Sequence, residues 1–284
     1  RRDFTINAMA WSLGEEDFGR LVDPFDGMRD LHEGIIRTPC DPDVTFSDDP
    51  LRMMRAVRFA SQLNFRLFPE TFEAIVRNRE RIGIVSRERI AVELNKIVLS
   101  PVPSVGFDLL ERTGLLELIF PEMQRLKGVE RRGQHAHKDN FYHTLKVLDN
   151  VAAVSDDLWL RWAAILHDIG KTCCYDVNST ISESANGRLL GHIAIGSAMV
   201  GKACDAVPGF PENLRLKLIH MVLASHGSSD KGSPVDPSIP EAVALHHADE
   251  LDANVERFLR ARQNGGPSDL FTYDPLLRTK VFMQ

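Results

Sequence analysis

The spacing of apolar residues changes once along the chain, near Asp49. Before that point, apolar residues come in short runs that Gly, Asp and Pro interrupt, which is typical of short strands and turns. Two strands are predicted over 4–12 and 20–23, on either side of an acidic turn over 14–19. Residues 23–31 are predicted as a turn and a short helix. A third strand is predicted over GIIRTP (34–39) and ends at Pro39.

From Asp49 onward, apolar residues recur at helical spacing, beginning with Met53, Ala56, Val57 and Ala60. Asp49 is a suitable N-cap, and Pro50 suits the first helical position. Further helices are predicted near 69–81, 86–99, 103–113, 114–119, 141–155, 157–170, 191–206, 211–225 and 239–263, with a loop or small hairpin over 174–188. Trp159 and Trp162 fall at a spacing that fits core packing. The predicted fold class is mainly α, with short β elements at the N-terminus, then a helical neck and an all-α domain.

Composition excludes some classes and leaves others open. With 284 residues and 43% apolar residues, the chain is long enough for more than one core. The net charge of −6 argues against a uniformly basic coat for nucleic acid, but residues 51–100 hold nine Arg and one Lys against five Glu. That stretch is either a phosphate-binding surface or a set of solvated helix faces. Four Cys without a CxxC pair predict reduced thiols and a cytoplasmic location. No leader or membrane-spanning run is recognised.

Histidines and carboxylates follow one another through the second half of the chain. His143 lies on one predicted helix, and His167 and Asp168 lie near the end of the next. Two helices that pack can bring such groups to one point, and mixed N/O ligands suit a divalent metal that hydrolyses phosphate esters. His192, His226 and Asp249 follow in order as further candidate metal ligands. Asp168 and Lys171 are the catalytic candidates, since Lys171 could meet a phosphoryl oxygen; the alternative is a structural polar cluster.

Three arginines share one side of the helix that starts at Asp49. Arg52, Arg55 and Arg58 lie there, and Asp49 precedes Arg52 by one turn. A carboxylate beside a guanidinium can imitate the edge of a base and bind a nucleobase. The alternative is an N-cap followed by an exposed arginine face.

Four ordered motifs resemble those of the bacterial tRNA nucleotidyltransferase and poly(A) polymerase family, which includes CCA-adding enzymes. They are RRDFTINAMA (1–10), DPFDGMRDL (23–31), DDPLRMMRAVRFA (48–60) and SRERIAVEL (86–94). The resemblance implies that Arg1, Arg2 and Asp3 contact ribose and phosphates of ATP or CTP and that Asp49 and Arg52 read the base. It implies that Arg89 and Glu93 brace this template. In that family a Gly-rich loop and metal-binding carboxylates precede RRD, so we expect this chain not to add nucleotides unaided.

The second half resembles the HD phosphohydrolase superfamily. HKDNFYHTLKVLDNV and LWLRWAAILHDIGKT resemble the HD domain of tRNA nucleotidyltransferases, whereas the segment after about residue 188 resembles HD-type 3′→5′ exoribonucleases. The resemblance implies a core metal set and a second metal position, with Mn²⁺, Mg²⁺, Ni²⁺ or Fe as candidates. The core set is His143, His167, Asp168 and Asp249, and His192 and His226 complete the second position. Ser225 stands where the exoribonucleases usually have a second His.

These resemblances predict three parts and a function. Residues 1–40 correspond to the nucleotidyltransferase head, 41–127 to the helical neck that binds nucleotide and RNA, and 128–284 to the HD domain. We expect a protein of tRNA 3′-end processing that hydrolyses 2′,3′-cyclic or terminal phosphates. The expected partners are nucleotides and a tRNA or other RNA 3′ end, without a membrane. An exoribonuclease and a non-catalytic tRNA-binding protein are the alternatives; the oligomeric state stays open.

Overall fold

The structure is a computed structural model of the 284-residue chain. It describes residues 2–132, 135–177, 181–264, 270–275 and 277–283, with the backbone alone given for 129–132, 135–138, 176–177, 181–183 and 264. The chain divides into two compact units, which we call the first unit (1–165 with 179–181) and the second unit (166–178 with 182–284).

The first unit opens with short, irregular elements. A 3₁₀ turn, Thr5–Asn7, precedes an antiparallel pair of strands, and a later strand pairs in parallel with one that follows the first long helix. Gly27 is required where the chain packs on this turn, because a Cβ there would lie 2.3 Å from the Thr5 carbonyl oxygen. The elements are β1 (Ala10–Trp11), β2 (Leu21–Val22), α1 (Gly27–Glu33), β3 (Ile35–Ile36) and β4 (Arg66–Leu67).

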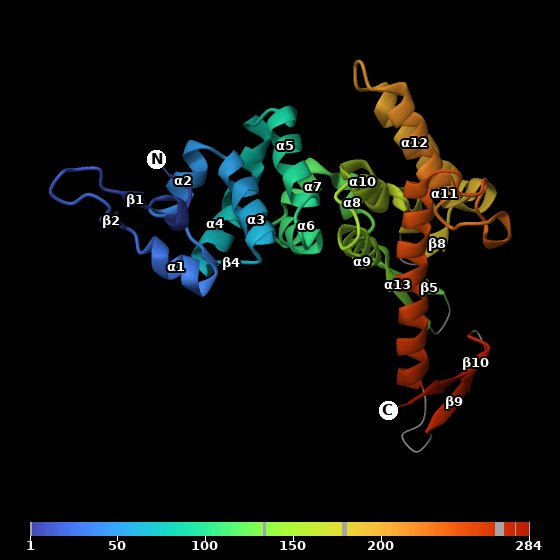
Figure 1. Ribbon diagram of the computed structural model, residues 1–284. Helices are drawn as coiled ribbons and strands as arrows, with labels where there is room; N and C mark the ends of the chain where they lie inside the picture. The colour runs from blue at the N-terminus through green and yellow to red at the C-terminus, as the bar shows by residue number, and fades with distance from the viewer. Residues whose placement is uncertain (1, 133–134, 178–180, 265–269, 276, 284) are drawn as a thin grey trace. The chain divides into compact units, whose positions relative to one another are not determined.

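Helices form the rest of the first unit (Figure 1). They are α2 (Pro42–Asp48), α3 (Leu51–Leu63), α4 (Pro69–Asn78), a 3₁₀ helix (Arg79–Ile84), α5 (Arg87–Val98), α6 (Pro103–Arg112), α7 (Leu115–Ile119), α8 (Pro121–Gln124), α9 (Asn140–Ala152) and α10 (Leu158–Leu166), with the hairpin β5 (Val129–Arg132) and β6 (His135–Asp139) before α9. α3 packs on α5 and α6, and its apolar face, including Met53, Met54 and Val57, is fully buried. This packing fixes which side of α3 presents its arginines.

The second unit is built around a 3₁₀ turn, Ile169–Cys173, that packs against α11 (Ala185–Asp205). α11 also packs on α12 (Glu212–Leu223), which contacts α13 (Pro240–Asn264). The hairpin of β9 (Phe271–Asp274) and β10 (Thr279–Phe282) lies against α13 (Figure 1). The short strands β7 (Tyr175–Val177) and β8 (Ile181–Glu183) lie between the turn and α11.

The mainly α fold class is confirmed, but several elements differ from the sequence prediction. The strand expected over 4–12 begins only at Ala10, because Thr5 turns inward and donates its hydroxyl hydrogen bond to buried Asp30 at 2.7 Å. The helix α2 was not predicted, although Asp41 accepts hydrogen bonds from two amides of its first turn. The hairpins β5–β6 and β9–β10 were not predicted either. α11 begins six residues before the predicted start and bends at Gly191, where φ is +73°.

Two smaller predictions have mixed outcomes. The Asp49 side chain accepts a hydrogen bond from the Leu51 amide at 3.2 Å, as an N-cap does, and α3 begins at Leu51. The core position expected for Trp159 is wrong: its side chain is exposed, because the buried face of α10 runs through Leu160, Ala163 and Ala164. In the described part of the chain, no helix combines the length and the apolar character needed to cross a membrane.

Candidate functional sites

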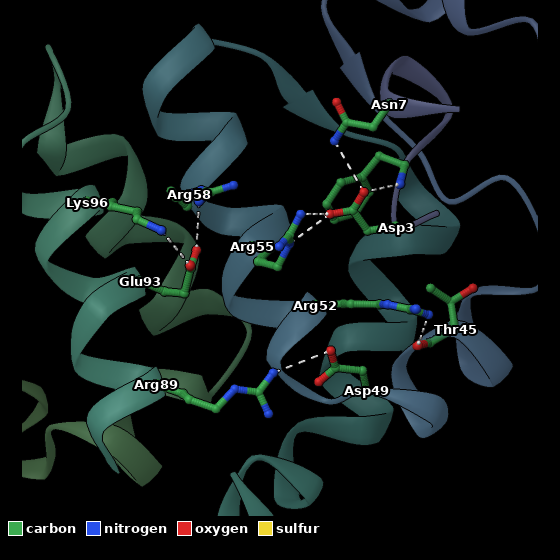
Figure 2. A network of polar contacts seen from close by, with 11 residues as sticks. Asp3, Asn7, Thr45, Asp49, Arg52, Arg55, Arg58, Arg89, Glu93 and Lys96 are labelled. Carbon is green, nitrogen blue, oxygen red and sulfur yellow. Dashed lines mark hydrogen bonds and ion pairs between the residues drawn. The ribbon is translucent and has the colours of Figure 1, made fainter. Parts of the chain in front are cut away.

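The first candidate site is a polar network between the N-terminal segment and α3 (Figure 2). Asp3 is buried, and its carboxylate accepts a hydrogen bond from Arg55 Nε at 2.7 Å and one from the Asn7 amide at 3.2 Å. Burial opposes ionisation, yet the hydrogen bond from Asn7 and the charge of Arg55 outweigh it and hold the pKa of Asp3 below its ordinary value. Two predicted nucleotide ligands, Asp3 and Arg55, therefore bind each other.

The predicted base-reading pair lies at the start of α3. Asp49 and Arg52 are both half-buried. Asp49 Oδ2 lies 3.6 Å from Arg89 of α5, and Arg52 donates a hydrogen bond to the Thr45 carbonyl at 3.2 Å (Figure 2). These contacts fix the direction of both side chains, as base recognition would require.

Glu93 of α5 makes a second link to α3. It forms ion pairs with Arg58 at 3.1 Å and with Lys96 at 3.0 Å. Arg58 is buried, and burial lowers its pKa against the opposing charge of Glu93. Arg89 and Glu93, which sequence spacing would pair with each other, thus each pair with a different group at α3. Arg58 is placed to position α3 rather than to reach a nucleotide directly.

The remaining members of the predicted nucleotide site are at the N-terminus. Arg2 is exposed, and Arg1 lies outside the described residues. Sequence reasoning missed Asn7 and Lys96, although Asn7 follows Asp3 by four positions and Lys96 follows Glu93 by one helical turn. Each contact depends on which way a turn or helix faces, which spacing alone did not decide.

The second candidate site brings together three metal-type donors of the second unit. Asp168 directly precedes the 3₁₀ turn, His192 lies on α11, and His226 follows α12. His192 Nε2 lies 3.5 Å from Asp168 Oδ1 and 3.4 Å from His226 Nε2. Lys171 Nζ lies 2.7 Å from the other carboxylate oxygen, Oδ2. The donor atoms of these three residues all lie within 4.8 Å of one another.

Both histidines of this cluster are held in the neutral form. Burial lowers the pKa of His192 to about 4, against the attraction of Asp168, and burial likewise lowers the pKa of His226. A neutral imidazole offers a lone pair to a metal, whereas a protonated one does not. The two rings, the ionisable Asp168 and the adjacent Lys171 therefore suit a divalent cation with a phosphate beside it.

Other predicted ligands lie next to this cluster or elsewhere in the chain. His167 is fully buried, with Nε2 3.4 Å from Asp168 Oδ2 and 3.9 Å from Asp249 Oδ1. His143 is buried on α9 of the first unit, and its place in the metal set stays a prediction. Ser225 is buried and donates its hydroxyl hydrogen bond to the Val222 carbonyl, so it serves the end of α12.

Comparison with protein families gives three matches in chain order. The model of the poly A polymerase head domain matches residues 1–37. The model described as a probable RNA and SrmB-binding site of polymerase A matches residues 64–126, and the HD domain model matches residues 140–254. The HD match includes the Asp168 cluster.

The chain is also similar to curated proteins named Multifunctional CCA protein. The chain is 42% identical over 175 residues to a Multifunctional CCA protein of Nitrosococcus oceani, covering 60% of this chain and 41% of that protein. It is 32% identical over 266 residues to a Multifunctional CCA protein of Nitrosospira multiformis, covering 92% of this chain and 60% of that protein. The chain thus spans less than two thirds of these relatives.

Solved structures agree in fold. A tRNA nucleotidyltransferase complexed with a primer tRNA and an incoming ATP analog is 24% identical with a TM-score of 0.54, covering 93% of this chain and 71% of that chain. A CCA-adding enzyme with CTP is 22% identical with a TM-score of 0.52, covering 93% and 60%. The three ordered family matches show that the chain carries a poly A polymerase head segment, a polymerase A RNA-binding segment and an HD domain, in that order, and these solved structures share its fold.

Proposed function

We propose that this protein takes part in tRNA 3′-end processing and that its HD domain hydrolyses phosphate esters at RNA 3′ ends, either 2′,3′-cyclic or terminal phosphates. The observation that carries the proposal is the group Asp168, His192 and His226, whose donor atoms converge beside the ammonium of Lys171. Nitrogen and carboxylate donors in a half-buried cluster are the set that hydrolytic metal sites use.

The donors fit a divalent transition ion better than Mg²⁺, which prefers oxygen ligands and retained waters. We therefore propose Mn²⁺, Ni²⁺ or Fe as the metal, with one or two ions. His167 and Asp249 lie beside the cluster and join the proposed set, and His143 joins it on the family resemblance.

The roles of the protein groups follow from their contacts. When bound, a divalent ion supplies Lewis-acid polarisation and a stronger water nucleophile near neutral pH. Lys171 holds Asp168 Oδ2, which leaves Oδ1 directed toward His192. The ammonium of Lys171 also supplies positive charge beside the position of a phosphate. His192 is partly exposed, so substrate can approach from its side of the cluster.

For the first unit we propose nucleotide and tRNA binding through Arg2, Asp3, Asp49 and Arg52, with Arg55, Arg58, Arg89 and Glu93 positioning them. The contacts of the Figure 2 network and the names of the relatives support this proposal. Whether the chain adds nucleotides, and the cytoplasmic location expected from its cysteines, stay predictions.

The hydrolytic proposal is tested with purified chain, 2′,3′-cyclic AMP and Mn²⁺ or Ni²⁺. Asp168→Asn should lower the rate at least about 100-fold, because one donor of the cluster is lost. His220→Gln is the matched control, since His220 lies in the same unit and accepts a hydrogen bond from the Ser238 amide instead. Equal rates in Asp168→Asn and the parent chain would remove the site.

A labelled single-stranded RNA separates this proposal from the exoribonuclease alternative. We expect conversion of a terminal phosphate without shortening of the strand. Stepwise release of mononucleotides that Asp168→Asn abolishes would instead assign the same cluster to an exoribonuclease. A parent chain that hydrolyses neither substrate and binds no metal would favour the non-catalytic alternative, in which the first unit binds RNA.

A further inference from the structure

A second group of metal-type donors lies on α13, apart from the Asp168 cluster. His246, His247 and Glu250 each place one donor atom within 4.8 Å of the other two. His246 Nε2 lies 3.6 Å and His247 Nδ1 lies 3.8 Å from Glu250 Oε2. None of the three is a donor of the Asp168 cluster.

The orientation of His246 is set by the loop that follows α12. Its Nδ1 lies 3.2 Å from the Ser225 carbonyl oxygen. A carbonyl oxygen can only accept, so Nδ1 carries a proton, and Nε2 is the nitrogen turned toward Glu250. The ring also packs directly on Gly227, where a Cβ would lie 2.6 Å from it. A histidine whose other nitrogen donates to a backbone carbonyl is the usual arrangement for a metal ligand.

The direction of the Glu250 side chain is likewise set by a contact from this loop. Lys231 Nζ lies 2.5 Å from Oε1 and donates a hydrogen bond to it, which fixes the direction of the carboxylate. The second oxygen, Oε2, is the one directed toward both histidines. Lys231 belongs to the same loop as Ser225 and Gly227, so contacts from the loop fix two of the three donors.

We propose that His246, His247 and Glu250 form a separate binding site for a zinc-class divalent ion. By holding these side chains, the ion would stabilise the contacts that His246 and Glu250 make with the 225–232 loop. Two nitrogens and one carboxylate oxygen are a donor set that Zn²⁺ accepts, with water at the fourth position. With bonds of about 2.0–2.1 Å, tetrahedral donors lie about 3.4 Å apart, so separations of 3.6 and 3.8 Å need only small side-chain shifts. Because His226 lies in the same loop, the ion would hold the backbone on both sides of that residue.

The test uses the full chain carrying Asp168→Asn, so that binding at the other cluster is weakened. Zinc is titrated against a chromophoric chelator, and bound zinc is counted after gel filtration. We expect His247→Gln combined with Glu250→Gln to remove about one zinc ion per chain, or to weaken its binding at least about 100-fold. In the chain that retains the site, zinc should also slow amide exchange over residues 225–232.

Glu241→Gln is the matched control. Glu241 is another lysine-paired glutamate of α13, with Lys217 Nζ at 2.9 Å, but it is not one of the three donors. This variant should bind as much zinc as its Asp168→Asn parent. Far-UV circular dichroism without zinc checks that each variant is folded.

An unchanged zinc count and affinity after the double substitution would overturn the proposal, as would a parent chain that binds no zinc. Neither result bears on phosphate hydrolysis, which is measured in chains with Asp168 intact. Conversely, if the Asp168 cluster does not hydrolyse phosphate esters, the number of zinc ions bound at α13 should be unchanged.

Discussion

At the scale of single residues, sequence reasoning passed over one buried arginine. The guanidinium of Arg161 is buried in the first unit and donates to the carbonyl oxygens of Val98 and Ser100, both at 2.9 Å, and of Ser155 at 2.8 Å. These carbonyls lie at or just beyond the C-terminal ends of α5 and α9, where helices leave acceptors unsatisfied. Its ion pair with Asp156 matters less, because the Asp156 side chain is almost wholly exposed.

Replacing Arg161 with Met should therefore destabilise the first unit. Several buried carbonyls would lose their donor at once, and we expect a loss of about 3 kcal/mol or more in the free energy of unfolding. Urea unfolding followed by circular dichroism measures it. Arg125→Met, which removes an exposed guanidinium paired with Glu122, should change stability by less than about 0.5 kcal/mol. A similar small loss for Arg161→Met would show that water satisfies these carbonyls.

Asp3 should make stability depend on pH in a defined direction. Its pKa is lowered in the folded chain from the ordinary value of 3.8, so its contribution is complete above that pH and is lost as the pH falls through the lower folded value. Asp3→Asn should cost about 1–2 kcal/mol at pH 7, and this difference should shrink below about pH 4. The free energies of unfolding of the parent chain and of Asp3→Asn, measured at several pH values, check the trend. Asp108→Asn is the control, because it removes a pair with the exposed Arg112 and should lower the free energy of unfolding little at any pH. A difference that stays constant with pH would contradict the contribution of Asp3 ionisation.

At the scale of elements, close backbone packing sets the geometry of the metal cluster. The 3₁₀ turn carrying Gly170 touches α11 so closely that a Cβ at Gly170 would lie 2.0 Å from the His192 carbonyl oxygen and 2.6 Å from the Gly196 nitrogen. Backbone atoms cannot move aside as a flexible side chain can. The distance between Asp168 and His192 therefore depends on glycine at position 170.

Gly170→Ala should force this turn away from α11. We expect Mn²⁺ affinity, measured by calorimetry, to fall at least about tenfold as Asp168 and His192 separate. Gly196→Ala should have a milder effect, because its Cβ would meet the Gly170 nitrogen at 3.3 Å, and Gly83→Ala should have none, because nothing lies within 4 Å. If all three variants bind Mn²⁺ alike, the turn can shift without disturbing the cluster.

The link between α3 and α5 should behave as a buried ion pair. Glu93→Leu would leave buried Arg58 without its carboxylate, which costs about 3–5 kcal/mol. Combining it with Arg58→Met should restore much of the loss, because two apolar side chains then replace two charges. Unfolding free energies of the single and double variants form the cycle. Losses that simply add would argue that the two residues act independently.

At the scale of the whole molecule, two compact units carry chemically different candidate sites. The first unit holds carboxylate and guanidinium groups suited to a nucleotide, and the second holds imidazoles and carboxylates suited to a metal. The division at residue 165 lies within the matched HD segment, 140–254, so the compact units and the family segments do not share a boundary. The three predicted parts, 1–40, 41–127 and 128–284, stay a prediction.

Hydrogen exchange of the intact chain should separate the two sites. ATP or CTP should slow exchange around residues 45–60 and 86–96, which carry most of the polar network of Figure 2. Mn²⁺ should slow exchange around 168–174 and 190–196, which carry Asp168 and His192. Arg52→Ala should abolish the first effect and leave the second. Protection of 168–174 by a nucleotide without metal would contradict this assignment.

The sequence by itself determined the mainly α class, most helix positions and the family resemblance, because helical periodicity and ordered motifs are local properties of the chain. It also named Asp168, His192 and His226 as candidate ligands, whose donor atoms the structure places within 4.8 Å of one another. Only the tertiary structure decided which polar groups meet. Arg55 pairs with Asp3, and Glu93 pairs with Arg58 rather than with Arg89. Arg161 donates hydrogen bonds to buried carbonyl oxygens at the ends of helices. Such contacts join residues tens of positions apart, and their partners depend on how helices pack, which no spacing along the chain specifies.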